Sequence, residues 1–92
     1  MFYYVYVLKS EKDSLFYIGY TTNLKKRLAD HNKGKNFSTK FRRPFKLIFY
    51  ESYLNKSDAL RREKYFKTSP GKRVLRLILR DYLRGVVYPE VK

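Results

Sequence analysis

The sequence predicts an α+β fold, a small three-stranded β-sheet flanked by helices in the order β-β-α-β-α-α. Two aromatic and β-branched runs separated by a short polar stretch predict a β-hairpin at the start of the chain. A third run of this kind follows a helical segment, and two more segments with apolar residues at helical spacing complete the chain. With 92 residues, we expect one domain over residues 1–84 and a tail over 85–92.

The hairpin is predicted to join residues 2–8 to residues 15–20. The first of these segments is an unbroken aromatic and β-branched run, which favours a strand buried on both faces. If the turn centres between Glu11 and Lys12, residues whose numbers sum to 23 face each other. Tyr6 and Tyr17 then lie side by side on one face of the sheet. Packing is the ordinary role of such a pair, because tyrosine is a good strand residue whose hydroxyl tolerates a half-wet site.

A helix is predicted from residue 24 to about residue 33. Residues 21–23 are three candidate N-caps in a row, and Gly34 is well placed to end the helix. Arg27 and His31 are four residues apart, so they project on one side of it. Taken alone, they are an exposed cation and a surface histidine.

A basic loop over residues 35–46 has no hydrophobic period. It mixes cations with short hydrogen-bonding side chains, a combination that suits phosphate contacts. The alternative is a flexible polar connection. Phe37 and Phe41 argue against pure disorder, because they can anchor the loop or stack on a base.

Residues 45–53 are predicted to form the third strand, and their continuous apolar run favours a central position in the sheet. A helix starting at residues 55–58 follows, with Asn55 or Ser57 as its expected cap. By helical spacing its inward residues are Ala59, Leu60, Glu63 and Phe66. Glu63 is therefore an acid on a face where a core residue is expected. A buried carboxylate needs a partner, so a salt bridge is its default role.

The last helix is expected to have Ser69 as its cap and Pro70 as its first residue, to run to about Arg84, and to stop at Gly85. Its predicted inward residues are Val74, Leu75, Ile78 and Tyr82. Basic side chains occupy its other faces.

The charge balance points to a polyanion, most simply a nucleic acid. The chain carries 22 Lys and Arg against 8 Asp and Glu, a formal net charge of +14. It has no cysteine and a single histidine, which excludes disulfides, thiolate metal sites and a zinc site of several histidines. No apolar run is long enough for a membrane span. We expect a cytoplasmic protein and assume a monomer.

Two tyrosine triplets suggest a family. Tyr4-Val5-Tyr6, then ten residues, then Tyr17-Ile18-Gly19 resembles the signature of the GIY-YIG nucleases. The second triplet matches in full, whereas the first has Tyr4 for Gly and Val5 for Ile. The size looks like that of the small stand-alone members, which are similar to the N-terminal nuclease domain of excinuclease C.

Three later residues support the resemblance. Arg27 and His31 fit the family pattern Arg-x-x-x-His, and Glu63 matches the metal-binding Glu on a helix after the third strand. The resemblance implies a divalent-metal-dependent DNA endonuclease, with Mg²⁺ (or Mn²⁺) held by Glu63. Its implied catalytic residues are Tyr6, Tyr17, Arg27, His31 and Glu63.

Roles follow from side-chain chemistry. Arg27 offers a planar fork to the phosphoryl oxygens. We favour Tyr17 as the base and Tyr6 as the group that positions the water, although the two could exchange roles. His31 could relay the proton or hydrogen-bond a tyrosine hydroxyl. The residues expected to contact nucleic acid are Lys26, Lys35, Ser38, Thr39, Lys40, Arg42, Arg43, Lys64, Lys67, Lys72 and Arg73.

One departure from the family pattern leaves an alternative function open. Many family members carry a further Asn near the end of the domain, and residues 67–92 contain no Asn, Gln or His. A non-catalytic nucleic-acid-binding module of the same fold is therefore the alternative, with RNA as a possible ligand in place of DNA. A structural protein bound to ribosomal RNA is a third possibility.

Overall fold

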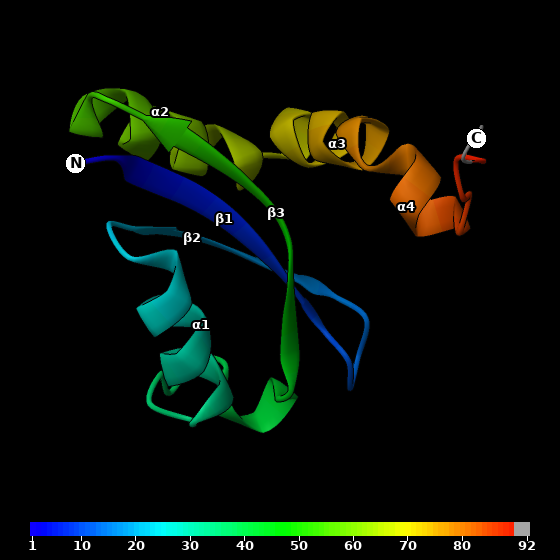
Figure 1. Cartoon of the computed structure of the whole chain (residues 1–92), viewed down its shortest axis with the longest axis horizontal. Helices are drawn as coiled ribbons and strands as arrows, with labels where there is room; N and C mark the ends of the chain where they lie inside the picture. The colour runs from blue at the N-terminus through cyan, green and yellow to red at the C-terminus, as the bar shows by residue number, and fades with distance from the viewer. Residues whose placement is uncertain (90–92) are drawn as a thin grey trace.

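The computed structural model describes residues 1–89, which form a three-stranded antiparallel sheet with helices on both faces (Figure 1). This arrangement confirms the predicted α+β class. In chain order the elements are β1 Tyr3–Ser10, β2 Phe16–Thr21, α1 Leu24–Asn32, a short 3-10 turn Lys40–Arg42, β3 Phe45–Tyr53, α2 Lys56–Phe66, α3 Ser69–Ile78 and α4 Arg80–Arg84. No helix within residues 1–89 is long and apolar enough to cross a membrane.

Strand β1 is the centre of the sheet, because the strand order is β2-β1-β3. The prediction that residues 45–53 form a central strand is therefore wrong. Most of β3 is only half-buried, and Tyr50 on it is 52% exposed. An apolar run can serve an edge strand when helices cover part of both faces, so the run alone did not reveal the strand order.

Two cores lie on opposite faces of β1. Val5 and Val7 pack with Ala59, Phe66 and Leu75 beneath α2 and α3. The alternate residues of the same strand pack on the other face, where α1 covers them; this second core holds Tyr6, Leu8 and Phe45, with Leu24 and Leu28 against it. Figure 1 shows α1 on one side of the sheet and α2 and α3 on the other. A strand buried on both faces was predicted from its unbroken apolar run.

The hairpin register differs from the prediction by two residues. Paired residue numbers sum to 25, so Tyr6 lies opposite Gly19 and Leu8 lies opposite Tyr17. The turn is longer because the Ser10 hydroxyl accepts the backbone N–H groups of residues 12 and 13, and Ser14 adopts a positive φ of 63°. A shift of two residues keeps every side chain on its face. Tyr6 and Tyr17 therefore remain neighbours.

The starts of α1 and α2 agree with their predicted caps. The Asn23 side chain accepts the backbone N–H of Lys26, and the Asn55 side chain accepts that of Ser57. Gly34 follows the end of α1 with a φ of 76°, as expected of a residue that ends a helix.

The last helical segment is broken rather than continuous, which corrects the prediction. Thr68, not Ser69, caps α3, and Leu79 leaves the helical conformation between α3 and α4. With the helix broken at Leu79, the buried residues are Leu75 and Leu79, and the predicted inward residues Ile78 and Tyr82 are exposed. Gly85 ends α4 with a φ of 72°, as predicted.

Leu60 on α2 is exposed and not inward as predicted, because Ala59 and Phe66 fill the contact with the sheet. Residues 86–89 have no regular structure, and residues 90–92 of the predicted tail lie outside the described residues.

Candidate active site

The Tyr6 hydroxyl is the centre of a buried polar cluster between β1 and α1. Tyr6 extends from the middle of β1 and is 1% exposed. Arg27 and His31 lie one turn apart on α1 and both reach it. The Arg27 Nε donates to the Tyr6 hydroxyl over 3.1 Å, and the His31 Nε2 lies 3.0 Å from the same oxygen. The predicted side-by-side placement of Arg27 and His31 is confirmed.

The hydrogen bonds continue from His31 into the basic loop. The His31 Nδ1 lies 2.9 Å from the Thr39 Oγ1, which donates to the backbone carbonyl of Asn36 over 3.4 Å. A carbonyl only accepts, so Thr39 must receive its other hydrogen bond from the Nδ1–H of His31. The Nε2 of His31 then accepts from the Tyr6 hydroxyl. Donation therefore runs in one direction, from Arg27 through Tyr6, His31 and Thr39 to the loop backbone.

The side chains in this series of hydrogen bonds are uncharged, except for Arg27. Burial raises the pKa of Tyr6, and the hydrogen bond from Arg27 only partly offsets that effect. Burial also lowers the pKa of His31, and the positive charge of Arg27 adds to that effect. The hydrogen bond to Tyr6 is the main cause of the raised pKa of Arg27. Near neutral pH the cluster therefore holds a phenol, an uncharged imidazole and one guanidinium.

Tyr17 completes the cluster on the solvent side. Its ring centroid lies 6.4 Å from that of Tyr6 and 4.9 Å from that of His31. Tyr6 and His31 are fully buried, whereas Tyr17 is only partly so. Tyr17 is therefore the aromatic residue of this cluster that a solvent molecule can reach.

Gly19 leaves the space that Tyr6 fills. It pairs directly with Tyr6 across the hairpin, and a β-carbon on it would overlap the Tyr6 hydroxyl and the ring carbon that bears it. The residue must be a glycine for the phenol to lie across β2. The first and second tyrosine triplets are thus a single packing unit.

These triplets match a known family model. The GIY-YIG catalytic domain model matches residues 2–74. The chain belongs to the GIY-YIG family. GIY-YIG proteins are in general nucleases that depend on a divalent metal, so membership supports a nuclease-type function acting on nucleic acid.

Similar GIY-YIG relatives are small proteins. The UPF0213 protein SH2523 of Staphylococcus haemolyticus is 46% identical over 77 residues, covering 83% of this chain and 93% of the relative. The UPF0213 protein YazA of Bacillus subtilis is 48% identical over 66 residues, covering 71% of this chain and 66% of the relative. The solution NMR structure of the UPF0213 protein BH0048 from Bacillus halodurans is 33% identical with a TM-score of 0.54, and 85% of each chain is covered.

Glu63 does not take part in the hydrogen bonds of the polar cluster and pairs with Lys67 instead. It is on α2, the helix layer that covers the other face of the sheet, and its carboxylate is 3.2 Å from the ammonium of Lys67. That ion pair is the partner expected for an acid on this face. The charge of Glu63 still makes a small contribution to the raised pKa of Tyr6. The structure therefore brings Tyr6, Tyr17, Arg27 and His31 into contact, and Glu63 into electrostatic range of them.

Glu63 can be a metal ligand without further acids. Residues 1–89 contain no cluster of three His, Cys, Asp or Glu side chains that could enclose an ion. Mg²⁺ does not need such a cage, because it usually keeps several waters and takes one or two carboxylates together with substrate phosphates. The half-buried Glu63 carboxylate fits that mode.

Thr39 corrects the predicted nucleic-acid surface. It was expected to contact phosphate, but it is fully buried and serves His31 instead. No sequence signal points to this role, because the loop has no period that places Thr39 inward. Other predicted contacts are engaged in ion pairs, namely Lys26 and Lys35 with Asp30, Arg42 with Asp13, and Lys67 with Glu63. Ser38, Arg43, Lys64, Lys72 and Arg73 are exposed.

Proposed function

We propose that this chain is a divalent-metal-dependent DNA endonuclease that hydrolyses phosphodiester bonds at the polar cluster around Tyr6. The observation that carries the proposal is the Tyr6 hydroxyl, held between Arg27 and His31 and next to the partly exposed Tyr17. The net charge of +14 supports a polyanionic substrate.

Tyr17 is the proposed general base. Tyr6 is fully buried, its pKa is raised, and its hydroxyl already donates to His31, so it is poorly suited to take a proton from an attacking water. Tyr17 lies beside it with access to solvent. In this arrangement Tyr6 and His31 are positioning residues, because they fix the guanidinium of Arg27 and the ring of Tyr17 in place.

Arg27 is the proposed phosphate clamp. Its Nε is used by Tyr6, which leaves its two terminal amino groups to meet the phosphoryl oxygens as a planar fork. Its raised pKa keeps it charged at every working pH. A fixed guanidinium stabilises charge that develops on the phosphoryl oxygens, and it needs no reorganisation during the reaction.

Glu63 would hold Mg²⁺ or Mn²⁺, with water and substrate oxygens as the remaining ligands. When bound, that ion supplies neutralising charge at the leaving oxygen. Lys67 competes with the ion for the same carboxylate, so metal binding would release Lys67 toward the substrate backbone.

The test is single-turnover cleavage of plasmid, single-stranded, flap and branched DNA with Mg²⁺, Mn²⁺ or EDTA. Tyr17→Phe should slow cleavage by about 10²-fold or more, the usual contribution of a positioned base. Glu63→Gln should lose cleavage and retain DNA binding. Tyr20→Phe is the matched control, because Tyr20 lies on the same strand and packs into the core on the other face. A Tyr6→Phe, Tyr17→Phe double variant that cuts at the wild-type rate would refute the proposed site.

A second candidate is a nucleic-acid-binding module that does not cut. It is favoured by residues 67–92, which contain no Asn, Gln or His where many family members carry an Asn. A wild-type protein that binds DNA or RNA tightly but leaves every substrate intact, with either metal, would favour this candidate over the endonuclease.

A further inference from the structure

Two aromatic rings are exposed on the loop that carries Thr39. Phe37 is 80% exposed and Phe41 is 69% exposed. The ammonium of Lys40 lies 5.3 Å from the ring centroid of Phe37 and 4.9 Å from that of Phe41. The two rings therefore flank one cation, and they are not buried in either core of the protein.

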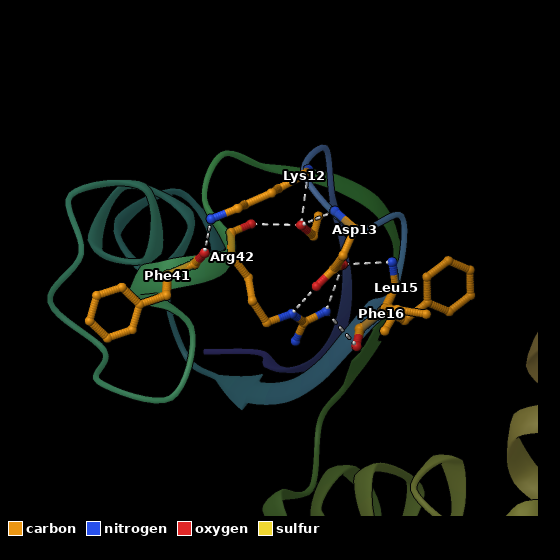
Figure 2. A network of polar contacts seen from close by, with 7 residues as sticks. Lys12, Asp13, Leu15, Phe16, Phe41 and Arg42 are labelled. Atoms are coloured by element: carbon orange, nitrogen blue, oxygen red, sulfur yellow. Dashed lines mark hydrogen bonds and ion pairs between the residues drawn. The ribbon is translucent and has the colours of Figure 1, made fainter.

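One end of this loop is fastened to the β1–β2 turn, as Figure 2 shows. The Lys12 ammonium donates to the backbone carbonyl of Phe41 over 3.0 Å, and the Ser10 hydroxyl donates to that of Arg42 over 2.6 Å. The Arg42 guanidinium in turn lies 2.8 Å from Asp13 and holds the pKa of that carboxyl at about 2. The Phe41 ring is therefore exposed on a backbone segment that these hydrogen bonds hold in place.

The middle of the loop is fastened to the polar cluster. Thr39 lies between the two phenylalanines in sequence, is fully buried, and accepts from His31. Its position is therefore tied to the hydrogen bonds that hold Tyr6. Phe37 and Phe41 are each two residues from this anchor in the chain, so the backbone that carries their rings is tied to the residue that contacts His31.

We propose that Phe37 and Phe41 form a stacking platform for unpaired bases, which makes single-stranded segments or flaps the preferred substrate. The inference rests on the proposed function, since it names the substrate class of that same site. Any base can stack on an aromatic ring, so the platform selects unpaired bases without selecting a sequence. A paired base keeps its faces inside the duplex and cannot use the rings.

Charge complementarity favours nucleic acid over a protein as the partner of these rings. Residues 31–50 contain no Asp or Glu, and their six cations are Lys33, Lys35, Lys40, Arg42, Arg43 and Lys46. A base that enters displaces the Lys40 ammonium from the ring faces, and that ammonium can then meet the phosphate of the same nucleotide. Because the loop is already anchored, little ordering opposes binding.

The experiment measures binding in EDTA, so that it does not depend on cleavage. Single-stranded and duplex oligonucleotides of one length, with 2-aminopurine in the strand, report affinity and base stacking together. Phe37→Ala and Phe41→Ala should each weaken single-strand binding by about 5- to 150-fold, the usual effect of removing one stacking ring, and should reduce the fluorescence change. Duplex affinity should stay unchanged.

Matched variants distinguish base stacking from nonspecific apolar contact. Phe37→Tyr keeps a ring and should retain wild-type single-strand affinity, whereas Phe37→Leu keeps only apolar area and should resemble Phe37→Ala. Tyr88→Ala removes an exposed aromatic ring from the region after α4 and should have no effect. Melting temperatures equal to that of the wild type show that the variants are folded.

Several results would overturn the inference. A Phe37→Ala, Phe41→Ala double variant with wild-type affinity for single strands would do so, and so would an equal loss for single strands and duplex. If wild-type protein binds single strands and duplex equally, with no fluorescence change, the stacking platform is contradicted and the endonuclease proposal is unaffected. Wild-type protein that binds no nucleic acid would defeat both. Selective single-strand binding that depends on the rings, in a protein that never cuts, would support the platform and defeat only the endonuclease.

Discussion

The phenol of Tyr6 crosses the position that any side chain on Gly19 would occupy, and its hydroxyl there meets Arg27 and His31. Helical spacing and strand alternation were enough to predict that Arg27 and His31 lie together, and that Tyr6 and Tyr17 share a face. Neither rule could predict Thr39, because its burial depends on where an irregular loop crosses the end of α1. These four residues of regular elements could thus be placed from sequence, and the loop residue could not.

Gly19→Ala should displace the Tyr6 ring and break both hydrogen bonds to its hydroxyl. Overpacking of this kind costs about 1–3 kcal/mol of the free energy of unfolding, and cleavage should fall with it. Gly85→Ala is the comparison, because a β-carbon there meets nothing within 4 Å but the backbone has a φ of 72°. That variant should lose stability through strain and still cut normally. Equal effects of the two variants on cleavage would contradict the packing role of Gly19.

The burial of His31 predicts that the free energy of unfolding depends on pH. Burial lowers its pKa in the folded state, so the unfolded chain binds a proton first as the pH falls. The stability that the neutral imidazole contributes is therefore fully present above the unfolded pKa of about 6.5, and it is lost as the pH falls from there toward the lower folded pKa. Urea unfolding at a series of pH values measures it.

His31→Gln is the control for this dependence. Its amide can accept from Tyr6 and donate to Thr39, and it does not titrate. His31 is the only histidine in the chain, so the variant should lose the decline of stability that begins below about pH 6.5. A wild-type free energy of unfolding that stays flat over this range would contradict a neutral, buried His31.

Among the elements, the starts of α1 and α2 could be predicted because Asn23 and Asn55 are local caps that act on their own helices. The register of the hairpin could not, because it depends on a buried side chain that bonds to a distant segment. Ser10 accepts two backbone N–H groups of its own turn and donates to the carbonyl of Arg42. The break at Leu79 likewise reflects packing against the sheet and leaves no local signal.

Ser10→Ala should loosen both the turn and the basic loop. The substitution leaves the carbonyl of Arg42 without this donor and removes the acceptor for two N–H groups, so we expect a loss of about 1–3 kcal/mol in the free energy of unfolding. Ser38→Ala is the control, since Ser38 is exposed on the same loop. Thermal melts of both variants decide the point. A Ser10→Ala protein as stable as the Ser38→Ala protein would show that the turn does not hold the loop.

At the scale of the whole molecule, the dominant property is the excess of cations over the surface. Binding to DNA should therefore weaken steeply with salt, by at least about tenfold between roughly 50 and 200 mM, because each phosphate contact releases counterions. Arg73→Gln should reduce the slope of log affinity against log salt by about 1 if it contacts a phosphate. Arg61→Gln is the control, because Asp58 already pairs with Arg61 at 2.7 Å. Affinity that does not respond to salt would contradict a phosphate-based interface.

Strand β1 is paired along both of its edges and covered on both of its faces. Its amide protons can therefore meet solvent only when the whole sheet opens. The amides of Val5, Tyr6 and Val7 should exchange with deuterium at the slowest rates in the chain and should report the global free energy of unfolding. On β2 and β3 every second amide points away from β1, so fast and slow exchange should alternate along both strands. The central tyrosine of the proposed active site would then lie on the last segment of this protein to open.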